Sequence, residues 1–269
     1  MEDVSVRAVL RAVEVMHERL GEQLTIDDLA GAAMFSKFHF TRIFQRLTGV
    51  PPGRFLSALR LQRAKNLLVS TSMNVADISV QVGYSSVGTF SSRFSRSVGM
   101  SPTAYRRRAG FHAATPTAVD GTDRRSNARI SCRLRLLEPD NVVIFVGMFA
   151  HRIPEGRPVR CAVLSEPGQV VFNQVPFGTW HLLAQSVSLD GAYAGTGAGL
   201  ADRPVSVAAY GPFTVQADST IATNLELRPS QDLAPPVLLA LLDVRKYAME
   251  WISEAPGVTR LGYERSAAA

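Results

Sequence analysis

The chain has 269 residues, 46% of them hydrophobic and 19% charged, a composition typical of a globular protein with room for two domains of ordinary size. It contains no apolar run long enough to predict a transmembrane helix, and its first residues do not resemble a secretory signal, so we expect a cytoplasmic protein without a membrane partner. Its two cysteines, Cys132 and Cys161, have no neighbouring Cys or His at metal-ligand spacing, which argues against a disulfide framework or a zinc site.

Positive charge is concentrated in the N-terminal part of the chain. Residues 1–110 carry a net charge of +7, whereas residues 111–269 carry a net charge of −1. Beyond residue 22 the basic segment contains only three acidic residues, Asp27, Asp28 and Asp77. A basic segment followed by a neutral one indicates a polyanionic partner at one end of the molecule. Charge alone does not distinguish DNA from RNA or an anionic lipid surface.

The first 110 residues have the hydrophobic period of helices. Apolar residues between positions 6 and 20 recur every three to four residues, which predicts one buried helix face. Thr25 followed by Asp28 is typical of a helix N-cap with an acidic first turn. A long helix is predicted over residues 52–69, ending before the polar stretch at 71–74.

The same segment contains an internal repeat with an offset of 50 residues. Ser36, Phe40, Phe44, Gly49, Pro52 and Phe55 recur as Ser86, Phe90, Phe94, Gly99, Pro102 and Tyr105. Leu29 and Ala30 recur as Ile78 and Ser79 with an offset of 49, so the second copy has one extra residue in its turn. Each copy predicts a short helix, a turn, a serine whose hydroxyl caps the next helix, and that second helix. This layout is a helix-turn-helix, used twice.

The second half of the chain has the period of strands. Residues 115–127 have the polar, non-periodic composition of a linker. Short strands are predicted at 130–136, 142–149, 159–164, 170–175, 180–187, 205–210, 213–215 and 223–227, and a helix at 236–252. The expected fold is therefore multidomain. An all-α double helix-turn-helix domain (1–110) and a linker (111–128) precede a mainly-β domain (129–269), which is an antiparallel sandwich or small barrel with a C-terminal helix.

The basic segment contains the motifs TIDDLA at 25–30, SKFHFTRIF at 36–44, RLQRAKNLL at 60–68, DISVQVGY at 77–84 and GMSPTAYR at 99–106. With these motifs it resembles the DNA-binding domain of the AraC/XylS family of transcription regulators. The resemblance implies seven helices, with a long helix connecting two helix-turn-helix units about one turn of DNA apart. It also implies a transcription regulator that binds double-stranded DNA, and it leaves RNA polymerase and a small-molecule effector as further partners. Most members carry this domain at the C-terminus, whereas here it comes first.

The second helix of the first helix-turn-helix unit, which follows Ser36 and which we call the first recognition helix, offers a polar face for DNA. Its candidate contacts are Lys37, Phe38, Thr41, Arg42, Gln45 and Arg46. The guanidinium fork of Arg42 matches O6 and N7 of guanine, and the ring of Phe38 suits a thymine methyl group. The alternative is an ordinary solvated helix face, with Phe38 folded under a neighbouring loop.

The second recognition helix has a different face. Gly88, Ser91, Ser92 and Ser95 stand where the first helix has Phe38, Thr41, Arg42 and Gln45, and the arginine and lysine that the family often has at the positions of Ser92 and Ser95 are missing. Arg93 occupies the position of the core residue Ile43, so we expect it to lie at the domain edge and reach sideways. The candidate contacts are Ser86, Val87, Gly88, Thr89, Ser91, Ser92 and Arg96. We therefore expect the first helix to read bases and the second to bind phosphates.

Other basic residues of the segment have two interpretations. Arg54, Arg60, Arg63 and Lys65 lie on the predicted connecting helix, and at least half of them are expected to be solvated or ion-paired rather than bound to DNA. The run at 106–108 either contacts phosphate or only solubilises the end of the domain, and the sequence favours neither.

No catalytic or cofactor motif is found in the second half. The hairpin at 168–184 is similar to those of prealbumin-like and carboxypeptidase-regulatory-like sandwiches, and Phe172 and Trp180 are expected in its core. His151, Cys161 and His181 fit no common metal spacing.

We expect neither an enzyme nor a cofactor, and we keep two alternatives. One is an enzyme with an appended helix-turn-helix, which needs a reactive cysteine, and the other is a nonspecific architectural protein. Activation or repression, the operator, the effector and the oligomeric state stay open.

Overall fold

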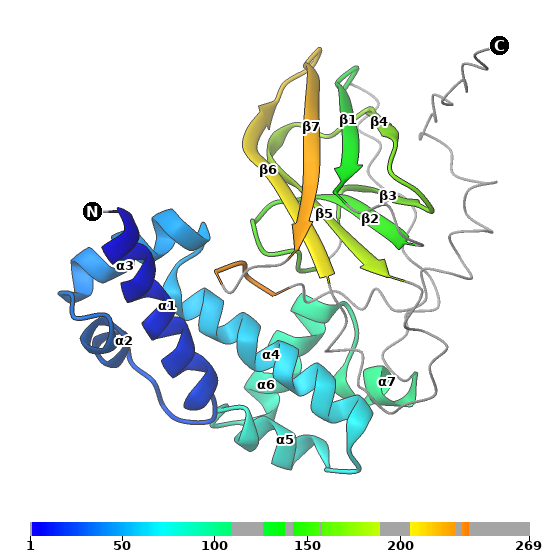
Figure 1. Ribbon diagram of the computed structural model, residues 1–269. Helices are drawn as coiled ribbons and strands as arrows, with labels where there is room; N and C mark the ends of the chain where they lie inside the picture. Colours follow the sequence, from blue (N-terminus) through cyan, green and yellow to red (C-terminus); the bar gives the residue numbers. More distant parts are fainter. Residues whose placement is uncertain are drawn as a thin grey trace.

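The computed structural model describes residues 2–108, 126–137, 142–156, 158–188, 205–229 and 233–236. Most of the linker expected at 111–128, and the C-terminal helix expected at 236–252, lie outside the described residues apart from their ends. Within the described residues, the chain forms a helical region followed by a strand region (Figure 1).

Seven helices form the N-terminal region, as the family resemblance implied. They are α1 (Glu2–Glu18), α2 (Ile26–Ala32), α3 (Lys37–Thr48), α4 (Pro52–Ser70), α5 (Val75–Gln81), α6 (Val87–Val98) and α7 (Pro102–Arg107). The long helix α4 contacts α1 and α3 on one side and α5 and α7 on the other. In Figure 1 it crosses the middle of the helical region, between the two helix-turn-helix units.

Local chemistry explains where the short helices begin. Helix α2 starts with a capping box, in which the backbone N–H of Thr25 donates to Asp28 (2.8 Å) and the N–H of Asp28 donates to the Thr25 hydroxyl (3.2 Å). Helix α5 starts at Asn74, whose side-chain oxygen accepts from the N–H of Asp77 (2.8 Å). These caps satisfy amides that the first turn of a helix leaves without partners.

The two copies of the repeat build the same core. Each has a chain of three aromatic rings with centroids 5.4–5.6 Å apart, Phe40–Phe44–Phe55 in the first copy and Phe90–Phe94–Tyr105 in the second. All six rings are buried. Because matched residues make matched contacts, the offset of 50 in the sequence is one structural unit used twice.

The turns of the two units are alike in backbone conformation but not in residue type. The second unit turns at Gly83 (φ +84°), and the first turns at Met34 (φ +56°), a side chain in the left-handed region that favours glycine. The serine caps also differ. Ser86 accepts from the N–H of Thr89 (3.2 Å), whereas Ser36 stands at the N-cap of α3 without a side-chain cap bond. Our prediction that the Ser36 hydroxyl caps α3 is therefore wrong, because that hydroxyl is not directed at the first turn of the helix.

The strand region is one sheet that curls until its ends nearly meet. Its strands are β1 (Arg129–Leu136), β2 (Val142–Phe149), β3 (Arg160–Leu164), β4 (Gln169–Asn173), β5 (Gly178–Ser188), β6 (Val205–Val215) and β7 (Thr220–Pro229). They are ordered β3-β2-β5-β6-β7-β1-β4. The outer strands β3 and β4 contact each other, and the Arg160 side chain at one end donates to the Asn173 carbonyl at the other (3.4 Å). The result is a nearly closed barrel.

One pairing corrects the expected antiparallel sheet. Strands β1 and β7 run parallel over eight residue pairs, from Arg129–Thr220 to Leu136–Leu227, while every other pairing among the described strands is antiparallel. The first and last strands come together because the sheet closes on itself, and local periodicity does not contain that long-range pairing.

The interior of the barrel is formed as the alternation in the sequence predicts. Ile130, Cys132 and Leu134 are buried on β1, between exposed or half-buried polar residues. Phe172 is fully buried, and Trp180 packs against the same core while its indole N–H donates to the Pro176 carbonyl (2.9 Å). Both aromatic residues are therefore core residues, as expected. Across the ranges that the structure describes, no helix has the length and apolar character needed to cross a membrane.

Candidate nucleic-acid interface

Helix α3 presents its polar stripe to solvent. Phe38 is 86% exposed, so it is not folded under a neighbouring loop. Arg42 is exposed and has no acidic partner among the described residues, and its nearest polar contact is the Nδ1 of His39 (3.5 Å). The remaining four candidates are exposed or half-buried on the same helix: Lys37, Thr41, Gln45 and Arg46. The structure thus brings the six predicted residues together on one accessible face.

Helix α6 presents a smaller and less charged face. Its seven predicted residues are exposed or half-buried: Ser86, Val87, Gly88, Thr89, Ser91, Ser92 and Arg96. Gly88, Thr89, Ser92 and Arg96 line one shallow concavity, together with Ser57 of α4 and Tyr84 of the turn. Arg93 lines the same concavity, and hydroxyl groups with two arginines on a concave surface suit a phosphate backbone better than a base edge. The assignment of these residues to DNA contact stays a prediction.

Arg93 reaches sideways from α6, as its position in the repeat predicts. It ion-pairs with Glu155 (3.3 Å), which lies in the loop between β2 and β3. Glu155 also pairs with Arg54 at the start of α4 and accepts from the hydroxyl of Ser97 (2.9 Å). The Glu155 side chain is only 10% exposed. One nearly buried carboxylate therefore connects the strand region to α4 and α6, and sequence reasoning did not identify it.

The same loop enters the helical core. Ile153 is 1% exposed and belongs to the core of the helical region, and the N–H of Gly156 donates to the Ser97 carbonyl (3.0 Å). Arg152 lies against Gly49, the residue that ends α3. The loop at 152–156 thus touches both helix-turn-helix units, at the end of α3 and along α6.

Several other arginines of the helical region have structural roles. Arg60 of α4 donates to the carbonyls of Leu20 and Glu22, which ties the connecting helix to the segment after α1. Arg106 donates to the carbonyls of Leu68 and Met73, which holds α7 to the end of α4. Neither interpretation of the run at 106–108, phosphate contact or solubilisation alone, therefore applies to Arg106, because its side chain packs two helices together.

A matched pair of glycines tests the docking of the loop. Gly49 and Gly99 end α3 and α6 with φ values of +77° and +90°. We expect Gly99→Ala to lower the free energy of unfolding by about 1–2 kcal/mol through backbone strain alone, because nothing lies within 4 Å of its added Cβ. Gly49→Ala should cost about 1–3 kcal/mol more, because its Cβ would lie 2.1 Å from Nε of Arg152.

Urea unfolding of the two alanine variants measures this difference. In an Arg152→Ala background, the excess cost of Gly49→Ala should disappear while the cost of Gly99→Ala stays the same. Equal costs in the wild-type background would show that Arg152 is not seated against α3 in solution.

The residues examined for a metal site do not converge on one. Among the described residues, no three His, Cys, Asp or Glu side chains gather at distances that would hold a metal ion. His151 and His181 are near Arg152, and burial together with the charges of Arg152 and His151 lowers the pKa of His181.

The two thiols are expected to be unreactive in the folded chain. Burial raises the pKa of both Cys132 and Cys161 to about 12, which leaves roughly one thiol in ten thousand ionised at pH 8. We expect both to react with a disulfide reagent at least about a hundredfold more slowly than free cysteine, and both to react at once in denaturant. A thiol that reacts at the rate of free cysteine in the native chain would support the enzyme alternative.

Two helix-turn-helix units with exposed second helices, joined by one long helix, define a double helix-turn-helix domain. A family model described as a helix-turn-helix domain matches residues 29–108. The HTH-type transcriptional activator AarP of Providencia stuartii is 32% identical over 87 residues, which are 32% of this chain and 64% of AarP. The MmsAB operon regulatory protein of Pseudomonas aeruginosa is 38% identical over 93 residues, 35% of this chain and 30% of that protein. Residues 29–108 belong to the helix-turn-helix domains of AraC-type transcription regulators.

These two relatives match about a third of the chain. An AraC-type transcriptional regulator from Chromobacterium violaceum, solved as a crystal structure, is 30% identical and has a TM-score of 0.38, covering 39% of this chain and 94% of that one. The chain spans less than two thirds of the length of the curated relatives it matches first, 64% for AarP and about 30% for the MmsAB regulator.

Proposed function

We propose that the protein is a sequence-specific DNA-binding transcription regulator that places α3 and α6 in neighbouring major grooves. The observation that carries this proposal is the exposed stripe of α3, with Arg42 and Phe38 free on a helix whose opposite face is buried by Phe40 and Phe44. A second unit of the same construction lies on the other side of α4, which suits two entries into one duplex.

The same proposal divides the chain into functional parts. Residues 1–110 are the DNA-binding domain, residues 111–128 the linker and residues 129–269 an accessory domain. The main hydrophobic clusters of the helical and strand regions are distinct, apart from Ile153 of the β2–β3 loop in the helical cluster, and they support this division. Double-stranded DNA in the cytoplasm is the partner, RNA polymerase and a small effector are further proposed partners, and no catalysis is assigned to the chain.

Selection of bound duplexes from a random pool, with the purified full chain, tests the proposal. We expect a selected sequence with two conserved blocks whose centres lie about 10 base pairs apart, because two helices about one turn apart meet the same side of the duplex. At a stated salt concentration the selected duplex should bind about a thousandfold or more tightly than a scrambled duplex of the same length.

The two alternatives give different outcomes in the same experiment. A nonspecific architectural protein would retain DNA without enriching a sequence, and its ratio of affinities would stay near one. An enzyme with an appended helix-turn-helix would enrich a sequence and contain a reactive thiol, contrary to the burial of Cys132 and Cys161.

A further inference from the structure

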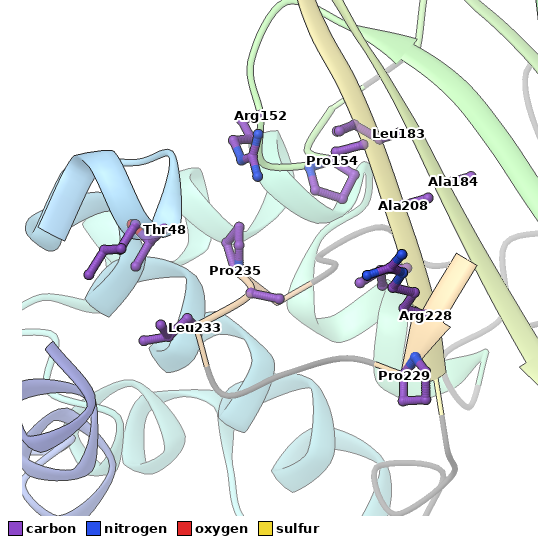
Figure 2. Close-up of a pocket in the computed structure, with 14 residues that line it drawn as sticks. Thr48, Arg152, Pro154, Leu183, Ala184, Ala208, Arg228, Pro229, Leu233 and Pro235 are labelled. Atoms are coloured by element: carbon purple, nitrogen blue, oxygen red, sulfur yellow. The ribbon is translucent and has the colours of Figure 1, made fainter. Parts of the chain in front are cut away.

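A cavity of about 330 Å³ lies between the helical region and the strand region. Its walls come from the end of α3, from the loop between β2 and β3, from strands β5, β6 and β7, and from the segment at 233–235 (Figure 2). Figure 2 shows Thr48 of α3 on one side, Arg152 and Pro154 of the loop above, and Arg228 with Pro229 of β7 on the other side. The volume is at the lower end of the range for small-molecule sites.

The lining combines an apolar surface with cationic ends. Leu47, Leu183, Ala208 and Leu233 contribute apolar side chains. The polar hydroxyl of Thr48 is already engaged, because it donates to the carbonyls of Phe44 (2.8 Å) and Val50 (3.0 Å). The groups that the walls offer to a ligand are therefore apolar side chains and guanidinium N–H donors.

The charge at the cavity is positive at Arg152, whose side chain lies against Gly49 at the C-terminal end of α3. This half-buried side chain has no acidic partner among the described residues, because the nearby carboxylate of Glu155 is engaged by Arg54 and Arg93. Within the described part of the chain, Arg228 ion-pairs with the exposed Glu226 on its own strand (3.2 Å). Burial, followed by the charges of Arg152 and His151, lowers the pKa of the nearby His181. An arginine at the edge of an apolar cavity fits a carboxylate with an apolar body.

We propose that this cavity binds a small organic monocarboxylate, with the carboxylate on Arg152 and the apolar body between α3 and strands β5 to β7. The proposal rests on the proposed function, and it names the chemical class of the effector. A ligand there would contact the last turn of α3, whose exposed stripe carries Arg42, and the loop whose Glu155 holds α6. A ligand changes DNA affinity when it binds the DNA-bound and the free conformations with different affinities, and a ligand that contacts both units senses their relative position.

Titration calorimetry without DNA tests the site directly. The probes are hexanoate and 3-phenylpropanoate, each compared with its amide, which has nearly the same shape without the charge. We expect saturable binding of at least one carboxylate, and binding of its amide at least about tenfold more weakly, because the amide cannot replace a charge-assisted pair with Arg152. Equal binding of acid and amide, or no saturable binding of either acid, would overturn the proposal.

Two variants and two matched controls locate the site. Arg152→Gln should weaken carboxylate binding about tenfold or more, whereas Arg133→Gln, an exposed arginine of β1 outside the cavity, should not. Ala209→Phe should block the cavity from the exposed side of β6, whereas Thr214→Phe on the same strand, outside the cavity, should leave binding unchanged. Binding that survives both Arg152→Gln and Ala209→Phe would place the ligand elsewhere.

The effector role has its own readout. A saturating carboxylate should change the affinity for the selected duplex at least about fivefold, and the duplex should change carboxylate affinity by the same factor, since coupling between two sites is reciprocal. Carboxylate binding with unchanged DNA affinity would refute the effector role. Absence of DNA binding would refute the proposed function, while the calorimetric result for the cavity would stand by itself.

Discussion

Replacing Arg42 by alanine is expected to weaken binding to the selected duplex about 5- to 150-fold and to remove discrimination at one base position. This range corresponds to the roughly 1–3 kcal/mol that a bidentate arginine contributes on guanine. The guanidinium is exposed on the face of α3 that also carries Phe38, and it has no acidic partner among the described residues, so it is free to reach a base edge. Affinities for the selected duplex and its single-base variants, at one salt concentration, measure the effect.

Alanine variants of the second helix are the matched comparison. Ser92→Ala and Ser95→Ala should each weaken binding less than Arg42→Ala, and by similar factors on all duplexes, because a phosphate contact carries no sequence information. An equal loss of discrimination from α6 would show that both helices read bases and that the proposed asymmetry is wrong. Retention of full discrimination by Arg42→Ala would assign base reading on α3 to other residues.

Glu155→Gln is expected to lower the free energy of unfolding by about 2 kcal/mol. Breaking a fully buried ion pair costs about 3–5 kcal/mol, because a charge remains without its partner. The cost here should be smaller, because the side chains of Arg54 and Arg93 are 34% and 24% exposed and water can reach them. Urea unfolding monitored by circular dichroism gives the value.

A double-mutant cycle distinguishes the ion pair from a general effect of the substitution. Arg93→Gln should lower the free energy of unfolding less in the Glu155→Gln background than in the wild-type chain. The difference between the two values is the coupling energy of the two side chains. Glu166→Gln, at an exposed carboxylate of the strand region, is the control and should change stability by no more than about 0.5 kcal/mol. A cost for Glu155→Gln no larger than that of Glu166→Gln would mean that the loop does not hold α6.

The helical region was predictable because its determinants are local. The caps at Thr25 and Ser86, the repeated aromatic positions and the repeated glycines Gly49 and Gly99 act within a few residues of the chain. The exception at Ser36 concerns one hydroxyl group, whose orientation depends on its surroundings rather than on its position at the N-cap.

The strands were also predictable, but their arrangement was not. Their positions lie close to those predicted, except that the strands predicted at 205–210 and 213–215 form one strand, β6. The alternation in β1 reflects one buried face, whereas β2 is buried on both faces over residues 144–149. The parallel pairing of β1 with β7 joins residues about ninety positions apart, and no local pattern records which strands meet when a sheet closes.

By itself, the sequence determined the duplicated helix-turn-helix, the exposed stripe of α3 and the sideways position of Arg93, since a helical period places each side chain relative to its neighbours. Only the tertiary structure revealed what Arg93 meets. Glu155 lies 62 residues from Arg93, in the other half of the chain. It forms this ion pair because a loop of the strand region docks between the two helix-turn-helix units. The same docking encloses the cavity at Arg152. Contacts between distant segments depend on how two folded regions fit, which neither region encodes locally.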